Sequence, residues 1–485
     1  MLLFIIIPLA VAALMPLLSR ASKKLPDVLA SLVMAALLGL GLYYLKPVAA
    51  GQVFTWDTGA YGLTVGFSLK LDGFALLLLI TTSLISLFSC IYSVNYMEHY
   101  GSKGSYYALF LLMVAGMNGL VMTTDLFNLY VFLEVAAIAS YALVAFGLKH
   151  DEVEAAFKYL MLSVVATSGM LLAMSFIYFM TGTLGFDSLQ AALHGNMKPQ
   201  LIGLCLAFFL MGFGLKAAVV PFHAWLPDAH PSAPAPISAM LSGVLIKVSG
   251  VYALARIVFN IFGFTPAIST ILLTLGVLSM VGGAMLALGQ SDFKCMLAYS
   301  SISQVGYIVI GLGVGTPMGI AGALFHLFNH ATFKSLLFLD AGATEYATGT
   351  RDLNKMGGLN NRLPITGLTT TVGAFSIAGI PPFNGFWSKL MIIMALVGAE
   401  HYFVAVLAVG ASILTLWYFL LSQRKAFFGK LAAGLEYVKE VPFFMAFATS
   451  CLALICLVVG LAFPWVVSNL IQPGVNALLG GTFVL

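Results

Sequence analysis

The feature that most constrains this chain is its succession of apolar runs long enough to cross a membrane. A hydrocarbon core about 30 Å thick needs roughly 20 mainly apolar residues in a helix. Hydrophobic residues make up 61% of the 485 and charged residues only 8%, whereas about a quarter of a soluble domain is charged. We therefore predict an all-α polytopic membrane protein, a single membrane domain of residues 1–485 with about 14 transmembrane helices. The predicted spans are 2–18, 28–45, 73–96, 106–123, 126–147, 156–181, 200–222, 234–260, 268–290, 296–315, 319–343, 365–397, 402–423 and 442–469.

Basic residues between these runs predict the orientation of the chain, because cytoplasmic loops are enriched in lysine and arginine. With the N-terminus outside, thirteen basic residues fall in inside loops and three in outside loops. The inside set is Arg20, Lys23, Lys24, Lys103, Lys149, Lys294, Arg351, Lys355, Arg362, Arg424, Lys425, Lys430 and Lys439, and the outside set is Lys46, Lys70 and Lys198. This bias predicts an integral protein of a prokaryotic inner membrane with both termini outside. The first run is predicted to be a retained helix, because no basic residue precedes it.

Cysteine and charge patterns argue against several other classes of protein. The five cysteines show no CxxC or paired Cys/His spacing, so no iron–sulfur, haem c or zinc site is expected. The net charge is +4 and no basic cluster is longer than Arg424–Lys425, which argues against a nucleic-acid partner. We expect no cofactor, no metal and no redox centre within the chain.

Four lysines lie deep inside predicted spans: Lys216, Lys247, Lys334 and Lys389. A charge at mid-membrane costs roughly 2.5–3.5 kcal/mol even on the mildest insertion scale. A purely structural protein gains little from four such groups, so a functional role is favoured. Two further basic residues, Lys158 and Arg256, lie near span ends, where a long side chain can reach the interface.

Glu134 is the one carboxylate well inside a predicted span. A buried glutamate needs a cationic partner or a proton. One interpretation is a structural ion pair that holds two helices together. The favoured one is a pair with a buried lysine that opens and closes as a proton arrives. Burial favours the neutral form of a lysine and a nearby carboxylate favours the charged form, so movement of the carboxylate releases the proton.

The eleventh span reads GALFHLFNHATFKSLLFLDAG and places His326, His330 and Lys334 four residues apart, on one helical stripe. Histidine titrates near neutral pH and can hydrogen bond through both nitrogens, so a hydrated proton path is favoured. Two alternatives remain. His-x-x-x-His is also a metal-ligand spacing, although no third ligand is evident. The histidines can also be structural, satisfied by neighbouring polar side chains.

Prolines predict broken helices beside two of the lysines. Pro221 leaves the carbonyl of Ala217 without its helical donor, directly after Lys216. Pro381 and Pro382 do the same for the carbonyls of Ile377 and Ala378, before Lys389. Such carbonyls need water or a side chain, because bare lipid offers no donor. Paired broken helices in two halves of a chain point to the ion path of a transporter.

Three motifs carry a resemblance to a known family: LKAAVVPFHAWLPDAHPSAPAPISAMLSGVLIKVSGVY, SDFKCMLAYSSISQVGY and HLFNHATFKSLLFLDAGA. Over about residues 70–425 the chain resembles the antiporter-like subunits of respiratory complex I, membrane-bound hydrogenases and Mrp-type sodium/proton antiporters. The resemblance implies two inverted five-helix repeats, here 106–260 and 268–424, with broken seventh and twelfth helices. Helices 1–3 (1–105) precede the repeats, and the last helix (442–469) follows them.

The resemblance also implies roles for single residues. Glu134 and Lys216 match the family's glutamate–lysine pair, and Lys247 matches its central lysine. Lys389 matches the exit-side residue of the twelfth helix, and Lys158 matches a lysine that some members have.

The chain departs from the family pattern at several points. Cys295 stands where many relatives have arginine, and Asp340 stands where glycine is common. A lysine at 389 is shared by only some branches. No long lateral helix like that of the largest complex I subunit is expected after the fourteenth span. This mixture leaves the parent complex open.

Three hypotheses follow. The favoured one is a proton- or sodium/proton-translocating subunit of a multisubunit energy-converting complex, such as complex I or a membrane-bound hydrogenase. Its proton path would run through Glu134, Lys158, Lys216, Lys247, His326, His330, Lys334 and Lys389. The second is a subunit of an Mrp-type antiporter without redox chemistry. The third is a structural subunit whose buried pairs only hold helices together. The expected partners are other membrane subunits, the lipid bilayer, protons and sodium.

Overall fold

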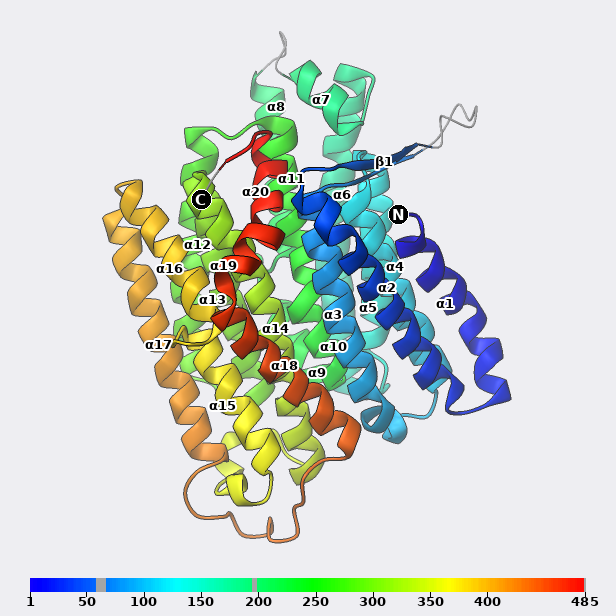
Figure 1. Ribbon diagram of the computed structural model, residues 1–485, viewed down its shortest axis with the longest axis vertical. Coiled ribbons are helices and arrows are strands. Elements are labelled where there is room, and N and C mark those ends of the chain that lie inside the picture. The colour runs from blue at the N-terminus through cyan, green and yellow to red at the C-terminus, as the bar shows by residue number, and fades with distance from the viewer. Residues whose placement is uncertain (58–66, 194–198, 484–485) are drawn as a thin grey trace.

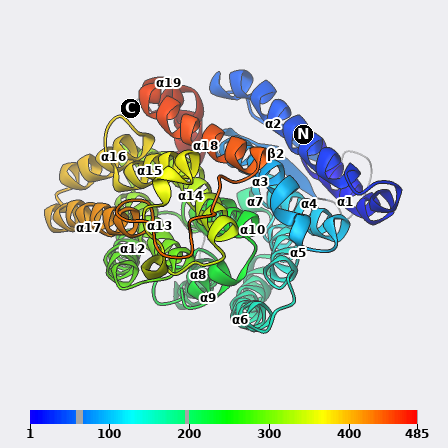
Figure 2. The ribbon, with the colours of Figure 1, turned by 90° about the horizontal axis from the view of Figure 1, so that it is seen from below.

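A bundle of long helices forms the molecule, and most of them run along its long axis (Figure 1). The computed structural model describes residues 1–57, 67–193 and 199–483. Seen end-on, α14 lies near the centre of the bundle (Figure 2), and its residues from Gly319 to Thr344 are buried without interruption. The α-helices are α1 Leu3–Ala21, α2 Leu25–Ala49, α3 Gly73–Tyr96, α4 Lys103–Met122, α5 Leu126–Val144, α6 His150–Thr181, α7 Phe186–Leu193, α8 Pro199–Lys216, α9 Leu226–Ser232, α10 Ala235–Met240, α11 Ala253–Arg256, α12 Pro266–Leu288, α13 Phe293–Val314, α14 Pro317–Thr348, α15 Pro364–Ala378, α16 Asn384–Gly398, α17 Tyr402–Ala426, α18 Phe443–Leu461, α19 Phe463–Val466 and α20 Gln472–Leu479.

Shorter elements complete the chain. Two strands, β1 Phe54–Asp57 and β2 Ser68–Leu71, form an antiparallel hairpin in which Phe54 pairs with Leu71. The 3₁₀ helices are η2 Met97–His99, η6 Leu353–Lys355 and η7 Leu359–Asn361, and the π-helical segments are η3 Leu241–Leu245, η4 Lys247–Tyr252, η5 Ile257–Phe262 and η8 Val467–Ile471.

The predicted polytopic all-α class is confirmed. Within the described chain, twelve helices are long and apolar enough to cross a membrane. The other two predicted spans correspond to α14, which carries the polar stripe, and to the α15–α16 pair. The last span is longer than predicted: after α18 the helix is interrupted near Ala462 and then continues through α19, η8 and α20 to Leu479.

Both chain ends lie toward the same end of the bundle, together with the β-hairpin and α7 (Figure 1). The opposite end carries the loop 427–442; we call it the basic end, because most of the loop lysines and arginines lie there. Its charges are paired across helices, as between Lys103 and Asp27 (2.8 Å) and between Arg351 and Asp292 (3.2 Å). Lys198, predicted for the other end, lies outside the described residues.

The seventh and twelfth spans are broken, as the prolines predict. In the seventh, α8 ends at Lys216 and α9 begins at Leu226. In the twelfth, α15 ends at Ala378 and α16 begins at Asn384. Gly379 permits the second break, because it has φ 82°, a left-handed backbone that favours glycine. Each break therefore places a lysine beside a helix end in the middle of the bundle.

The eighth span, Ala235–Phe262, differs from the regular helix that its apolar pattern predicts. It contains three π-helical segments, η3, η4 and η5, and η4 begins at Lys247. π-helical turns are rare and often lie at functional sites. The span is packed tightly against the first break, since a Cβ on Gly250 would lie 2.4 Å from the Cα of Ala217.

Candidate functional site: a buried axis of lysines and histidines

The polar stripe of α14 lies in the interior, and His326, His330 and Lys334 are all 0% exposed. The rings of His326 and His330 stack with their centroids 6.2 Å apart. His326 is tied to two neighbouring helices, through Nδ1 to Ser388 Oγ (2.9 Å) and through Nε2 to Gln304 Oε1 (3.2 Å). Neither ring nitrogen of His330 has a hydrogen-bond partner among the described residues. His330 is therefore the member of the stripe whose ring is not held by a hydrogen bond to another described residue.

Lys334 ends the stripe and is held by neutral groups. Its ammonium donates a hydrogen bond to Ser300 Oγ on α13. It also lies over the rings of Phe338 and Phe419, 5.8 and 5.9 Å from their centroids. Hydroxyl and aromatic faces stabilise an ammonium less than a carboxylate does, so its charge is only partly compensated.

Lys389 lies on α16, beside the second break, and its side chain reaches a backbone carbonyl that the prolines leave without a helical donor. Its Nζ donates to the carbonyl of Ile377, 2.8 Å away, at the end of α15. The same ammonium lies 4.7 Å from the centroid of the Tyr307 ring. The Ile377 carbonyl, which Pro381 leaves without a helical donor, thus accepts a hydrogen bond from Lys389.

Lys247 occupies the eighth span and is 0% exposed. Its Nζ folds back on its own helix and donates to the carbonyl of Ser242, five residues earlier. The hydroxyl of Ser242 in turn contacts that of Ser301 at 2.7 Å, which connects this span to α13.

Lys216 lies at the end of α8 and is 2% exposed. Its Nζ donates to Ser163 Oγ at 2.5 Å and to Tyr141 OH at 3.4 Å, and Tyr141 also donates to Ser163. The ion pairs of the described residues, taken to 4.0 Å, do not join Lys216 to Glu134. Oε1 of Glu134 is buried and has no hydrogen-bond partner among the described residues. The ion pair expected from the sequence is therefore not formed in this structure.

Two other basic residues near span ends behave differently from each other. Lys158 is about half exposed on α6 and pairs with Glu154 (2.9 Å) and with Asp228 on α9 (3.2 Å), away from the buried axis. Arg256 does not reach the interface: it is 7% exposed and pairs with Asp72 at 2.6 and 2.7 Å. The expected snorkelling is wrong for Arg256, because a buried carboxylate at the N-terminus of α3 satisfies the guanidinium inside the protein.

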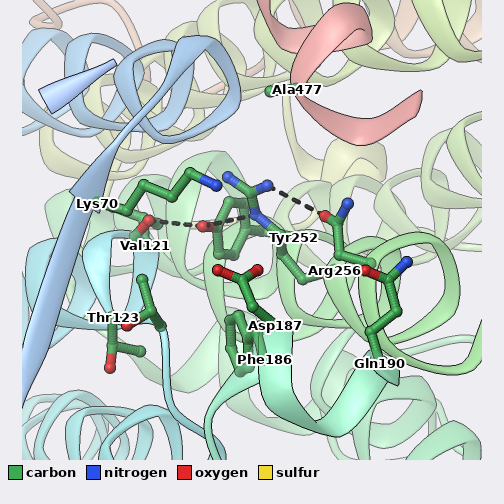
Figure 3. A pocket seen from close by; sticks show the side chains of 11 residues that line it. Lys70, Val121, Thr123, Phe186, Asp187, Gln190, Tyr252, Arg256 and Ala477 are labelled. Carbon is green, nitrogen blue, oxygen red and sulfur yellow. Dashed lines mark hydrogen bonds between the residues drawn. The ribbon is translucent and has the colours of Figure 1, made fainter. Parts of the chain in front are cut away.

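A cavity of about 70 Å³ lies beside Arg256, at the end of the bundle opposite the basic end. Figure 3 shows the carboxylate of Asp187 directed into it, opposite Lys70. Tyr252 lines this cavity: it accepts a hydrogen bond from Arg256 (3.0 Å) and donates one to the carbonyl of Val121 (2.5 Å) (Figure 3). Tyr252 ends the π-helical segment that begins at Lys247.

Comparison with known proteins places this arrangement in a family. Residues 123–415 match the family profile described as NADH:quinone oxidoreductase/Mrp antiporter, TM. The chain belongs to this family. Residues 56–107 also match the profile described as NADH-Ubiquinone oxidoreductase (complex I), chain 5 N-terminus. The resemblance drawn from the motifs is therefore confirmed.

Relatives of the chain come from both branches of the family. It is 36% identical to NADH-quinone oxidoreductase subunit N of Desulforudis audaxviator, over 91% of this chain and 89% of the relative. It is 34% identical to an Na⁺/H⁺ antiporter subunit of Alkalihalophilus pseudofirmus, over 88% of this chain and 86% of the relative.

Two solved structures show the same fold. The first is the Mrp complex from a Dietzia species, with a TM-score of 0.91, 28% identity and coverage of 98% of this chain and 96% of that chain. The second is the membrane-bound sulfane sulfur reductase, an archaeal respiratory membrane complex, with a TM-score of 0.89, 29% identity and coverage of 98% and 97%. The chain is thus an antiporter-like subunit of the kind found in multisubunit membrane complexes.

Sequence reasoning missed one polar group of this antiporter-like chain that lies close to the axis. His230 on α9 is 0% exposed, and neither of its ring nitrogens has a partner among the described residues. Its ring lies 4.7 Å from that of Phe338, and the Lys334 ammonium lies 5.8 Å from the centroid of the same Phe338 ring. A histidine in the proline-rich segment that follows the first break was the available signal. Among the described residues no group of three or more His, Cys, Asp or Glu is gathered as a metal would require.

Proposed function

We propose that this chain translocates protons, or exchanges them for sodium, as the antiporter-like subunit of a multisubunit energy-converting membrane complex. One observation carries the proposal. Lys216, Lys247, Lys334 and Lys389 are at most 3% exposed, and none of them is in an ion pair within the described residues. Burial without a counter-charge opposes the charged form of an amine. Each lysine can therefore take up and release a proton in response to a small change nearby.

The proposed path follows the buried groups. Protons reach Lys216 or Lys247 through a hydrated half-channel at the first break. They cross along the polar stripe of His326, His330 and Lys334, and leave past Lys389 at the second break. Glu134 sets the state of Lys216: when a neighbouring subunit moves the carboxylate toward the ammonium the proton is held, and when it moves away the proton is released. Lys158, exposed and paired with Asp228, links α6 to α9 at the rim of this path.

Proton flux through the assembled complex in proteoliposomes tests this proposal. Lys247→Ala is expected to reduce flux roughly tenfold or more, since the path loses an obligatory intramembrane site. Lys425→Met, an exposed lysine bonded to Asn354, is the matched control and should leave flux unchanged. Proton flux at the level of the unaltered complex in an assembled Lys247→Ala complex would contradict the proposal. Losses of activity that only parallel losses of assembly would favour the purely structural role.

A sodium/proton exchanger without redox chemistry is the second candidate. The 34% identity to an Na⁺/H⁺ antiporter subunit and the fit to an Mrp complex favour it. The identity to a quinone oxidoreductase subunit and the fit to a respiratory complex favour the redox-driven assembly. Purification of the complex in mild detergent from its native membrane separates the two. Co-purifying flavin, iron–sulfur or nickel subunits support the redox-driven complex, and their absence together with sodium-dependent proton flux supports the exchanger.

The proposed orientation places the basic end in the cytoplasm of a prokaryotic cell and both termini outside its inner membrane. The excess of lysine and arginine at the end opposite the termini supports it. Labelling of single cysteines from either side of the membrane tests it. A cysteine at Lys355 should react only from the cytoplasmic side, and one at Lys46 only from the outside.

A further inference from the structure

A second titratable site lies on α14, two turns beyond Lys334. Asp340 is 0% exposed. Its Oδ1 contacts the hydroxyl of Thr369 on α15 at 2.9 Å, whereas its Oδ2 has no hydrogen-bond partner among the described residues. The hydroxyls of Thr370 and Thr449 also lie against this carboxyl. Asp340 is thus a fully buried acid surrounded by neutral hydroxyl groups.

The groups that face Asp340 from the neighbouring elements supply no positive charge. They are Tyr92 from α3, Cys456 from α18 and Glu440 from the loop before α18. Within the described residues, no lysine, arginine or histidine lies within 4.0 Å of its carboxyl oxygens. An isolated carboxylate in such surroundings is strongly disfavoured, and it neutralises by binding a proton instead.

The hydrogen bonds around the Thr369 hydroxyl agree with a protonated Asp340. Its hydroxyl has one proton and lies near three acceptors: Asp340 Oδ1, the carbonyl of Ile365 (3.0 Å) and the carbonyl of Thr366 (3.1 Å). A threonine inside a helix commonly donates to a carbonyl three or four residues earlier. With its proton used there, Thr369 accepts a hydrogen bond at its oxygen, and a neutral carboxylic acid supplies the donor.

A row of threonines connects Asp340 to the basic end. Thr366 Oγ1 donates to Glu440 Oε1 at 2.7 Å, and Thr369, one turn further along α15, bonds to the Thr366 carbonyl. Glu440 is half-buried and also accepts from the backbone N–H of Ile365 at 2.7 Å. The buried acid of α14, the hydroxyl groups of Thr369 and Thr366 one turn apart on α15, and the acid Glu440 of the loop before α18 therefore follow one another toward the basic end.

We propose that Asp340 is a proton-binding site, a neutral carboxylic acid that exchanges its proton with the basic end past Thr369, Thr366 and Glu440, with a water carrying the proton between the two threonine hydroxyl groups. The site deepens the proposed function by adding a proton-storing branch beside the axis, and only its link to transport rests on that function.

Infrared spectroscopy of the purified complex tests the protonation state directly. We expect a carbonyl stretch of a neutral carboxylic acid that shifts in D₂O and disappears in Asp340→Asn. The control Glu436→Gln, an exposed acid in the same loop as Glu440, should keep the band. Thr369→Val retains the acid but removes its hydrogen-bond partner, so the band should move to higher frequency. This second variant assigns the band even if Asp340→Asn fails to assemble.

The kinetics test the route. Glu440→Gln should slow the hydrogen–deuterium exchange of the band several-fold, because the rim acid that relays the proton is gone. Persistence of the band in Asp340→Asn, or no shift in Thr369→Val, overturns the site. Loss of the band on adding sodium also overturns it, since a metal cation would then be the occupant. A transport-dead Lys247→Ala complex that keeps the band separates failure of the proposed function from failure of this inference.

Discussion

Lys389 donates a hydrogen bond to the carbonyl of Ile377, 2.8 Å away across the break of the twelfth span. The prolines that follow Ile377 leave its carbonyl without a helical donor, and the Lys389 ammonium donates a hydrogen bond to it instead. The broken helix therefore gives the buried ammonium an acceptor, and the ammonium gives the free carbonyl a donor. Lipid could supply neither partner.

Substitutions at Lys389 separate charge from proton exchange. Lys389→Arg keeps a cation and its hydrogen bonds but stays charged at all working pH values, so we expect roughly tenfold less proton flux or lower. Lys389→Ala should lose flux similarly and also destabilise the complex, since the Ile377 carbonyl is left unpaired. Flux in proteoliposomes and assembly on native gels measure the two effects. Normal flux in the arginine variant would contradict a titrating role.

His330 offers a test of the relay, because its ring makes no hydrogen bond to the described residues that a substitution can break. His330→Ala should reduce proton flux roughly tenfold or more while the complex stays assembled. His150→Gln is the control, because His150 is exposed at the start of α6. Equal flux in both variants would assign His330 to packing alone.

Much of this arrangement follows from local sequence pattern, and the rest depends on distant contacts. Hydropathy predicts the spans and prolines predict both breaks, because both signals depend only on residues within one or two helical turns of each other. The arrangement of Glu134 and Lys216 and the exposure of Lys158 depend on how helices pack. The same holds for the Arg256–Asp72 pair, whose members are 184 residues apart. The apolar sequence pattern around Lys247 does not predict the π-helical turns that the structure shows there.

The Asp72–Arg256 pair should stabilise the fold in a pH-dependent way. Burial opposes ionisation of Asp72, but the adjacent guanidinium outweighs it and holds the pKa of Asp72 below its usual value. A carboxyl whose pKa is lowered on folding stabilises the protein above its unfolded pKa, about 3.9. That stabilisation is then lost as the pH falls through the folded pKa. Thermal unfolding of the detergent-solubilised complex at decreasing pH should show this loss below about pH 4.

Variants of the same pair test the cost of an unpaired buried charge. Asp72→Asn leaves Arg256 unpaired and should destabilise by roughly 3–5 kcal/mol. Adding Arg256→Met should recover much of that loss, because the unpaired charge is then removed as well. A double variant that unfolds as easily as Asp72→Asn alone would mean that the pair is not the cause.

The contact between the first break and the eighth span should depend on the missing side chain of Gly250. A Cβ at this position would lie 2.4 Å from backbone atoms of Ala217, next to Lys216. Backbone cannot move aside as a flexible side chain can, so Gly250→Ala should cost roughly 1–3 kcal/mol and lower the midpoint of thermal unfolding. It should also reduce proton flux, because it pushes Lys216 away from the helix that carries Lys247.

Gly282→Ala is the matched control. Gly282 lies within α12, where the methyl group of an alanine would meet no described atom of another element within 4 Å. Alanine is also the better helix former. A Gly250→Ala complex as stable and active as Gly282→Ala would show that the two spans are not held at this distance in the membrane.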